Sequence, residues 1–308
     1  MNGWLAFDII IAGILLLFGA GIFEFAARAQ KMKRRRLAVS GIVVFGAVWI
    51  SVFYGSFIEP RFLIRREAEI ILSSVRTREL KAALVSDIHF GWYKGEAWGR
   101  RIVSEIHAAK PDVIFLDGDF VSGGSSDPDA ILSLEGLKAR YGVFAVTGNH
   151  DYDNGSKQAV VRALEANGFT VLENEQAVLD VDGKEFVVAG VSDIWNDASP
   201  VVALDGLSPE QTVILLSHNP DIILEDSVSL PPIVDLVLSG HTHGGQIRLP
   251  WIGSVPKIPD RLGRAFDRGF FPANQEHPAL FITSGAGETG PRARFFCPPE
   301  WELLTIRF

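Results

Sequence analysis

The sequence predicts an α/β domain that follows a hairpin of two membrane-spanning helices. Two apolar segments of membrane-spanning length occupy the N-terminal part of the chain. After residue 80, β-like apolar runs alternate with amphipathic helical runs, and five of the β-like runs end in Asp, Asn or His. This alternation is typical of a sheet with helices on its faces. We therefore expect residues 1–66 to form the hairpin and residues 67–308 to form one domain.

The first apolar segment covers residues 4–25 and contains only two charges, Asp8 and Glu24, near its ends. The second covers residues 37–58 and contains none. Each segment has about the 20 residues that cross the hydrocarbon core of a bilayer. The mean hydropathy of +0.20 is high for a soluble enzyme and agrees with apolar mass that lies in lipid.

The loop between the two segments predicts their orientation. Residues 28–36 contain six Lys or Arg, against three just after the second segment and none before the first. Such basic loops face the cytoplasm, so the domain is expected outside it, at the cell (inner) membrane. The opposite insertion stays open, because six charges against three is only a bias. In another interpretation, residues 31–36 begin an export signal with residues 37–58 as its apolar part, and the domain is again exported.

Charge and cysteine content exclude some classes of function. Residues 1–66 contain nine Lys or Arg and three Asp or Glu, so the rest of the chain, with 20 and 34, has a formal charge of −14. An acidic domain repels polyanions, so we expect no nucleic-acid partner, whereas bound divalent cations would offset the excess. Cys297 is the only cysteine, which excludes an intrachain disulfide. The oligomeric state stays open.

Several elements can be predicted from periodicity and turn residues. Apolar residues at helical spacing predict helices over residues 96–109, 127–139 and 156–166, whereas alternating residues predict a β-hairpin over 177–181 and 185–191 and a last strand over 301–306. Asn167-Gly168 would end the third helix, and Asp182-Gly183 would form the turn of the hairpin.

Five predicted strands are followed by polar residues with metal-binding side chains. Residues 82–86 precede Asp87 and His89, residues 112–118 precede Asp119, residues 141–148 precede Asn149, His150 and Asp151, residues 212–217 precede His218, and residues 234–240 precede His241 and His243. The carboxyl ends of strands in an α/β sheet share one edge, where sites form. So many carboxylates and imidazoles in one place would be left unpaired unless cations organised them.

These residues resemble the ordered sequence blocks of the calcineurin-like metallophosphoesterases. The matching blocks are Asp-x-His at 87–89, Gly-Asp at 118–119, Gly-Asn-His-Asp at 148–151, His218 and Gly-His-x-His at 240–243. Any single block arises by chance, but five in order are specific, and the resemblance covers about residues 80–308. It implies a four-layer αββα sandwich and a metal-dependent hydrolase of phosphate esters, above all phosphodiesters. The substrate would be soluble or linked to a lipid.

The resemblance also implies two divalent cations and their ligands. Asp87, His89, Asp119 and His243 would hold the first cation, and Asp119, Asn149, His218 and His241 the second, with Asp119 bridging. A mixture of carboxylate and imidazole suits manganese, iron or zinc. Two such cations can share a hydroxide that attacks the phosphate.

Two further residues have expected roles in catalysis. His150 matches the family position that assists the leaving group, with a purely structural role as the alternative. Asp151 is expected either to orient the His150 ring or to support the site from outside the ligand shell. Asp117 is expected to support Asp119 in the same way.

Residues 240–250 and 290–300 resemble an exported or membrane-linked bacterial branch that includes UDP-2,3-diacylglucosamine pyrophosphatase-like enzymes. Arg292 and Arg294 could there contact a substrate phosphate, although surface arginines often have no specific role. The long loop of residues 251–271 could shape the pocket or pack on the core. Two alternatives remain beside the phosphoesterase outside the cytoplasm: a cytoplasm-facing pyrophosphohydrolase of lipid A synthesis, and a catalytically silent metal-binding scaffold.

Overall fold

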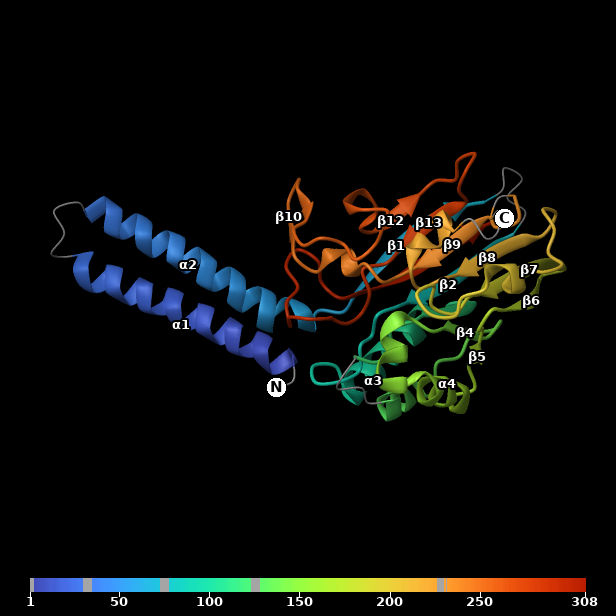
Figure 1. Ribbon diagram of the computed structural model, residues 1–308, viewed down its shortest axis with the longest axis horizontal. Helices are drawn as coiled ribbons and strands as arrows, with labels where there is room; N and C mark the ends of the chain where they lie inside the picture. Colours follow the sequence, from blue (N-terminus) through green and yellow to red (C-terminus); the bar gives the residue numbers. More distant parts are fainter. Residues whose placement is uncertain (1–2, 30–34, 73–77, 123–127, 226–229, 231) are drawn as a thin grey trace.

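The computed structural model describes residues 3–29, 35–72, 78–122, 128–225, 230 and 232–308. Two long helices, α1 (Gly3–Ala29) and α2 (Arg35–Phe57), run side by side and project from the rest of the molecule (Figure 1). Phe45 of α2 packs between Phe18 and Phe25 of α1, with ring centroids 5.0 and 5.5 Å apart. This is the predicted hairpin; Lys31, Lys33 and Arg34 of its basic loop lie outside the described residues.

The remaining chain forms two six-stranded sheets and a small third one. In spatial order, the strands of the first sheet are β1 (Ile64–Ile71), β14 (Glu300–Arg307), β2 (Glu79–Val85), β3 (Val113–Asp117), β4 (Val143–Val146) and β5 (Thr170–Val171). Those of the second sheet are β12 (Gly269–Phe271), β13 (Ala279–Ile282), β9 (Leu236–Ser239), β8 (Thr212–Leu216), β7 (Lys184–Gly190) and β6 (Glu175–Val181). The third sheet pairs β10 (Arg248–Leu249) with β11 (Gly253–Ser254).

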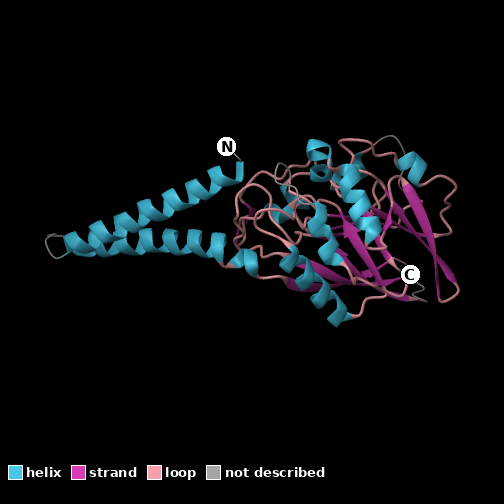
Figure 2. Cartoon of the chain, turned by 90° about the horizontal axis from the view of Figure 1, so that it is seen from below, coloured by secondary structure: helices cyan, strands magenta, loops and turns pink. Residues whose placement is uncertain are grey.

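The two large sheets stack face to face, and helices cover their outer faces (Figure 2). Phe115 of β3 and Phe186 of β7 lie in the core between the sheets. Helices α3 (Glu96–Ala109) and α4 (Lys157–Ala166) cover the first sheet through residues such as Ile102. The short helix α5 (Pro200–Ala203) and the 3₁₀ helix Pro220–Leu224 cover the second. The predicted αββα architecture is therefore confirmed.

Strand direction positions the site. Strands β2, β3 and β4 are parallel neighbours, and so are β7, β8, β9 and β13. All five residues of β3 and of β8 are buried, as expected for strands covered on both faces. The loops that leave the carboxyl ends of β2, β3, β4, β8 and β9 consequently meet at one end of the sandwich.

Most of the predicted elements are present, but the helix over residues 127–139 is wrong. Residues 128–134 form a 3₁₀ helix instead, and residue 127 lies outside the described part. Gly136 adopts a φ of 96°, which stops a helix before residue 139. Strand β1 begins at Ile64, three residues before the domain start expected from the sequence.

Candidate metal centre

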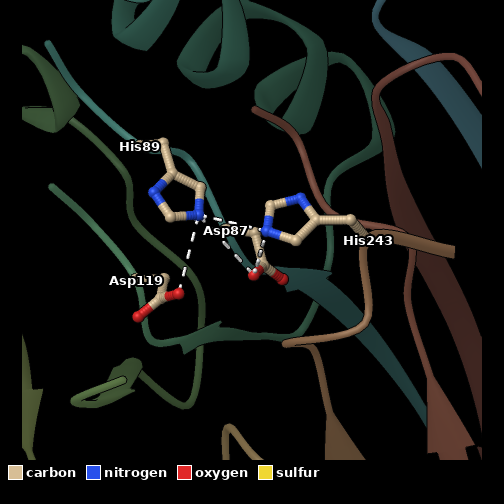
Figure 3. A group of neighbouring side chains, drawn as sticks. All are labelled: Asp87, His89, Asp119 and His243. Carbon is tan, nitrogen blue, oxygen red and sulfur yellow. Dashed lines mark hydrogen bonds and ion pairs between the residues drawn. The ribbon is translucent and has the colours of Figure 1, made fainter. Parts of the chain in front are cut away.

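Four predicted ligands from three loops point toward one another in Figure 3. Asp87 and His89 follow β2, Asp119 follows β3, and His243 follows β9. One ligand atom from each residue lies within 4.8 Å of the others, and all four residues are buried. The backbone N–H groups of Asp87 and His89 donate to the carbonyl oxygens of Gly118 and Asp119, each at 3.0 Å, which holds the first two loops together.

The distances in this cluster suit a single cation. The Nε2 atoms of His89 and His243 are 3.2 Å apart, and Asp87 Oδ1 lies 3.2 Å from His243 Nε2. Asp119 Oδ2 lies 3.5 Å from His89 Nε2. Two imidazole nitrogens and two carboxylate oxygens around one point form the mixed donor set that zinc, manganese and iron accept. The residues present therefore fit a divalent metal ion.

The other predicted ligands lie on the far side of Asp119. His218 Nε2 is 3.2 Å from Asp119 Oδ2. His218 Nδ1 donates to the carbonyl oxygen of Asp117 at 2.8 Å, which leaves Nε2 as the ligating nitrogen. Asn149 Oδ1 is buried and has no hydrogen-bond donor among the described residues. The ring of His241 lies 5.2 Å from that of His218, centroid to centroid.

His241 has a second contact that bears on its ligating atom. Its Nε2 lies 3.3 Å from the carbonyl oxygen of Pro259, so Nε2–H donates there and Nδ1 keeps its lone pair. Trp195 stands edge-on to the same ring, 4.8 Å away. The loop of residues 251–271 therefore contributes to the site through Pro259.

Burial keeps three of the histidines neutral. Desolvation lowers the pKa of His89 to about 3 and that of His241 to about 4. Burial, with the positive charge of nearby Arg294 as a smaller cause, holds the pKa of His243 well below its ordinary value. Neutral imidazole is the form that binds metals.

The charge of the site is concentrated between His218 and Asp119. Burial opposes a charge on either side chain, but their mutual attraction outweighs it. The pKa of His218 is raised well above its ordinary value, and that of Asp119 is lowered well below its own. A metal cation would replace the proton on His218 as the partner of Asp119.

The backbone of the site adopts left-handed conformations that residues with a Cβ atom avoid. Five residues have positive φ: Asp87 (53°), His89 (52°), Asp119 (53°), His241 (67°) and His243 (53°). Each such conformation costs about 1–2 kcal/mol. Strain of this kind persists where the surrounding structure enforces it, and it gathers at functional sites.

Two glycines allow the loops to approach this closely. A Cβ atom on Gly148 would lie 2.4 Å from Asp119 Oδ1, and one on Gly240 would lie 2.4 Å from Asp87 Oδ2. Any larger residue at either position would displace a predicted ligand.

Asp151 does not touch the His150 ring, so the expectation that it orients this ring is wrong. Its carboxylate accepts hydrogen bonds from the backbone N–H groups of Gly148, Asp119, Phe120 and Val121, at 2.9, 3.0, 2.8 and 3.2 Å. Asp151 therefore joins the loops after β3 and β4, which is the supporting role that the sequence also suggested.

The carboxylate at the His150 ring is that of Asp153. Its Oδ2 atom accepts from His150 Nδ1 at 2.8 Å, and His150 Nε2 lies 3.4 Å from the Thr289 hydroxyl. The His150 ring stands 5.2 Å from that of His89, centroid to centroid. Burial opposes a charged His150, but Asp119 and Asp153 outweigh it and raise the pKa. Sequence reasoning missed Asp153, which follows His150 by three residues in the segment Asn149–Gly155 and lies at a kink there, with a ψ of 132°.

The two arginines suggested as phosphate ligands have other contacts. Arg294 is completely buried and donates to backbone carbonyl groups of Ser284, Gly285 and Cys297, so its expected contact with substrate is wrong. Its Nη2 atom lies 3.5 Å from His243 Nδ1, behind the metal cluster. Arg292 pairs with Asp8 of α1 at 3.4 Å.

Comparison with known proteins identifies the family. A family model described as calcineurin-like phosphoesterase matches residues 80–245. The chain belongs to this family. A metallophosphoesterase of Caenorhabditis elegans is 33% identical over 84% of the chain, which spans 55% of that protein. Metallophosphoesterase YkuE of Bacillus subtilis is 31% identical over 90% of the chain and 99% of its own length. Phosphodiesterase YaeI of Escherichia coli is 32% identical over 64% of the chain and 71% of its own length.

Family membership and the buried Asp/His cluster together define the chemistry in general terms. The chain is a metal-dependent hydrolase of phosphate esters, and its cluster of Asp87, His89, Asp119 and His243 can hold a metal ion.

Proposed function

We propose that this chain is a membrane-anchored phosphodiesterase that works with two divalent cations. The first cation would be held by the cluster around Asp87. The second would be held by Asp119, Asn149, His218 and His241. The second site is supported by Asn149 Oδ1, which is buried without a hydrogen-bond partner among the described residues, and by His218 Nε2, which lies 3.2 Å from Asp119 Oδ2. The name of the E. coli relative supports a diester as substrate.

The cations, when bound, would supply Lewis-acid charge for the phosphate and an activated water as nucleophile. The protein would supply the rest. The His150 ring lies 5.2 Å from that of His89; its Nε2 would donate a proton to the leaving oxygen, while Asp153 holds the opposite nitrogen of the ring. Thr289 would fix the direction in which Nε2 points.

The membrane anchor is supported by the exposure of the two helices. Helical segments of 25 and 27 residues are long and apolar enough to span a membrane, and only 6% of each apolar window is buried inside the protein. Core helices of a soluble protein are mostly buried, so the exposure of these two helices supports a position in a membrane. A signal sequence can have the same length and apolar composition, but these helices also contact the domain. The Gly55 carbonyl oxygen of α2 accepts a hydrogen bond from the backbone N–H of Arg294 at 2.8 Å.

The end of the domain next to the helices adds support. The turn between β10 and β11 presents Trp251 fully exposed, with Leu249 and Ile252 also exposed beside it. Figure 1 shows β10 at the end of the domain from which the helices project. Tryptophan is enriched at membrane interfaces, so this turn would lie at the surface of the bilayer. The proposal places the domain on the side away from the basic loop, outside the cytoplasm.

The full chain in detergent tests the proposal. We expect hydrolysis of bis-p-nitrophenyl phosphate that a chelator abolishes and that added Mn²⁺ restores, with two metal ions per chain by elemental analysis. A comparison of Mn²⁺, Fe²⁺ and Zn²⁺ would identify the preferred ion. Hydrolysis that survives complete metal removal would overturn the mechanism, and a stoichiometry of one would remove the second site.

A further inference from the structure

An apolar cavity of about 320 Å³ lies where the helical hairpin meets the domain. One wall comes from α1, between Phe7 and Ile14, and another from α2, between Ser51 and Ser56. The domain contributes Ile247, Pro291, Ala293 and Phe295 to its lining. Apart from the two serines of α2, every lining side chain is apolar or a glycine.

We propose that this cavity binds the hydrocarbon chain of a membrane lipid and that the neighbouring metal centre hydrolyses a phosphodiester in the headgroup of that lipid. The proposal rests on the proposed function and names its substrate class. Water adds to phosphorus, and the bond from phosphorus to one ester oxygen breaks. The leaving oxygen gains a proton, and the attacking water loses one. The products are a phosphomonoester and an alcohol.

The position of the cavity along the helices suits a lipid chain. Its lining extends over α1 from Phe7 to Ile14, which is about 10 Å at 1.5 Å per residue. This stretch lies in the N-terminal half of α1, and Figure 1 shows the N-terminal end of α1 next to the domain. In a bilayer of about 30 Å hydrocarbon thickness, that stretch would cover the third nearest the domain. A lipid headgroup would then lie at the level of the domain.

One segment of chain connects the cavity with the catalytic residues. A Cβ atom on Gly285 would lie 2.5 Å from Asp87 Cβ, so the segment begins against a predicted metal ligand. Thr289 follows, with its hydroxyl 3.4 Å from His150 Nε2. Pro291 lines the cavity only two residues later, at most about 7 Å along the chain. A lipid whose chain lies in the cavity therefore has its headgroup within reach of the site.

The joint between hairpin and domain is fixed by hydrogen bonds, so the cavity is a built part of the molecule. Besides the bond from Arg294 N–H to Gly55, the Glu59 carboxylate accepts from the backbone N–H groups of Phe296 and Cys297 at 3.0 and 2.6 Å. Glu59 is itself buried. These contacts hold residues 291–297 against the end of α2.

The size of the cavity favours a hydrocarbon chain over other occupants. A volume of 320 Å³ has room for about ten groups the size of a water molecule, which takes about 30 Å³ in the liquid. This suits a run of methylene groups. A helix of a partner protein is about 10–12 Å wide and would not fit. Polar ligands would find few hydrogen-bond partners in an apolar lining.

A chromogenic series tests the proposal in the full chain reconstituted in nanodiscs. The substrates are p-nitrophenyl phosphodiesters whose second ester group is methyl, butyl, octyl or dodecyl. Val52→Phe adds a ring inside the cavity. Val44→Phe makes the same change two helical turns away, at an exposed position of α2 that does not line it. Nonspecific partition of the substrate into the bilayer is the same for both variants, so it cancels when their rates are compared.

We expect the wild-type kcat/KM to rise with chain length by up to about fourfold per methylene group until the cavity is full. Val52→Phe should lose most of this rise, at least tenfold on the dodecyl ester, and keep the methyl-ester rate. Val44→Phe should match the wild type. A wild-type enzyme that treats all four esters alike, or two variants that respond alike, would overturn the proposal.

Photolabelling gives a second readout that does not require activity. A phospholipid with a diazirine in its acyl chain should label Ile247, Ala293 or the cavity side of α2 in the wild-type protein, and Val52→Phe should reduce that label. Labelling confined to outward positions such as Val44 would reject the cavity as a lipid site. If labelling succeeds but no diester is hydrolysed, the proposed function fails while the lipid site stands.

Discussion

At the residue scale, the predicted site combines strain with charge. Asp119 belongs to both predicted cation sites, because His89 and His218 lie 3.5 and 3.2 Å from the same oxygen of its carboxylate. Its backbone is held at a φ of 53°. Backbone strain and buried charge both destabilise the fold, and both gather at functional sites. Their presence at Asp119 therefore supports a role in binding a cation.

Replacing Asp119 with Asn should abolish function. The amide keeps the shape of the side chain but removes the charge that would bridge two cations, so both metal content and turnover should collapse. Elemental analysis and the rate on bis-p-nitrophenyl phosphate would be measured on the same preparation. Two metal ions and a wild-type rate in Asp119→Asn would show that the bridging role is wrong.

The contact between Asp153 and His150 predicts a loss of activity that is smaller than that of Asp119→Asn and that depends on the leaving group. His150→Asn should lower kcat by about 10²–10⁴, with metal content unchanged, because a proton donor is lost. Asp153→Asn should lower it less, since the ring stays but its orientation is no longer fixed. Both defects should grow as the pKa of the leaving alcohol rises, because p-nitrophenolate leaves without a proton.

Asp153→Glu serves as the matched control and should recover part of the lost rate. An equal loss on good and poor leaving groups would instead assign His150 to stabilisation of transition-state charge. Loss of a metal ion from His150→Asn would make this residue a ligand or an essential support of one.

The sequence predicted that Asp87, His89, Asp119 and His243 come together, as they do in the structure, but it did not reveal the residues that support them. His89, His218 and His243 could be placed because each lies in the loop that follows a buried strand. The position of Asp153 depends on the kink in the segment Asn149–Gly155, and Arg294 lies behind His243 only because the chain returns there from β13. Such contacts are not encoded in local periodicity.

At the element scale, buried strands and amphipathic helices were predictable, whereas edge elements were not. Strand β3 is apolar up to its last residue, Asp117, and α3 carries Ile102 and Ile106 on one face. Strand β1 has the sequence IRREAEII, whose charges hide its role, and it is recognisable only from its parallel pairing with β14. Pairing between residues more than 200 positions apart leaves no local signal.

Strand β14 also contains a buried acidic pair that predicts a pH dependence of stability. Glu300 pairs with Arg66, while Glu302 accepts from the Thr283 hydroxyl at 3.1 Å. Burial and the charge of Glu300 raise the pKa of Glu302 from 4.5 to about 8. Between these values the folded chain holds a proton that the unfolded chain releases, so stability should fall as pH rises from about 5 to 8, by at most about 1.4 kcal/mol per pH unit.

Glu302→Gln removes this proton uptake and keeps the shape of the side chain. Other groups titrate in the same range, so the informative quantity is the difference in Tm between wild type and variant in the same detergent. We expect that difference to shift in favour of Glu302→Gln as pH rises from 5 to 8. Parallel Tm curves over that range would mean that Glu302 is ionised in the folded protein.

At the scale of the whole molecule, the hairpin and the domain form a continuous structure with the predicted site near their joint. Glu59, at the end of the second helix, accepts from the backbone at Cys297, and the Cys297 thiol lies 3.4 Å from the carbonyl oxygen of His243. A short chain of contacts therefore leads from the proposed membrane anchor to a predicted ligand. The sequence predicted both parts separately, but their docking depends on residues 287–297, which no periodicity marks as important.

The last prediction concerns the side of the membrane on which the domain lies. The basic loop predicts a domain outside the cytoplasm. Gln275 lies on an exposed loop of the domain, and the single native cysteine, Cys297, is buried. In intact cells, Gln275→Cys should therefore react with a membrane-impermeant maleimide, whereas Lys33→Cys, in the basic loop, should react only after lysis. The wild-type protein, whose single cysteine is Cys297, serves as the control and should stay unlabelled while it is folded. The reverse pattern would place the domain in the cytoplasm. It would leave the metal chemistry and the lipid site unchanged, but the lipid would then come from the cytoplasmic leaflet, because the cavity lies at the domain end of the helices.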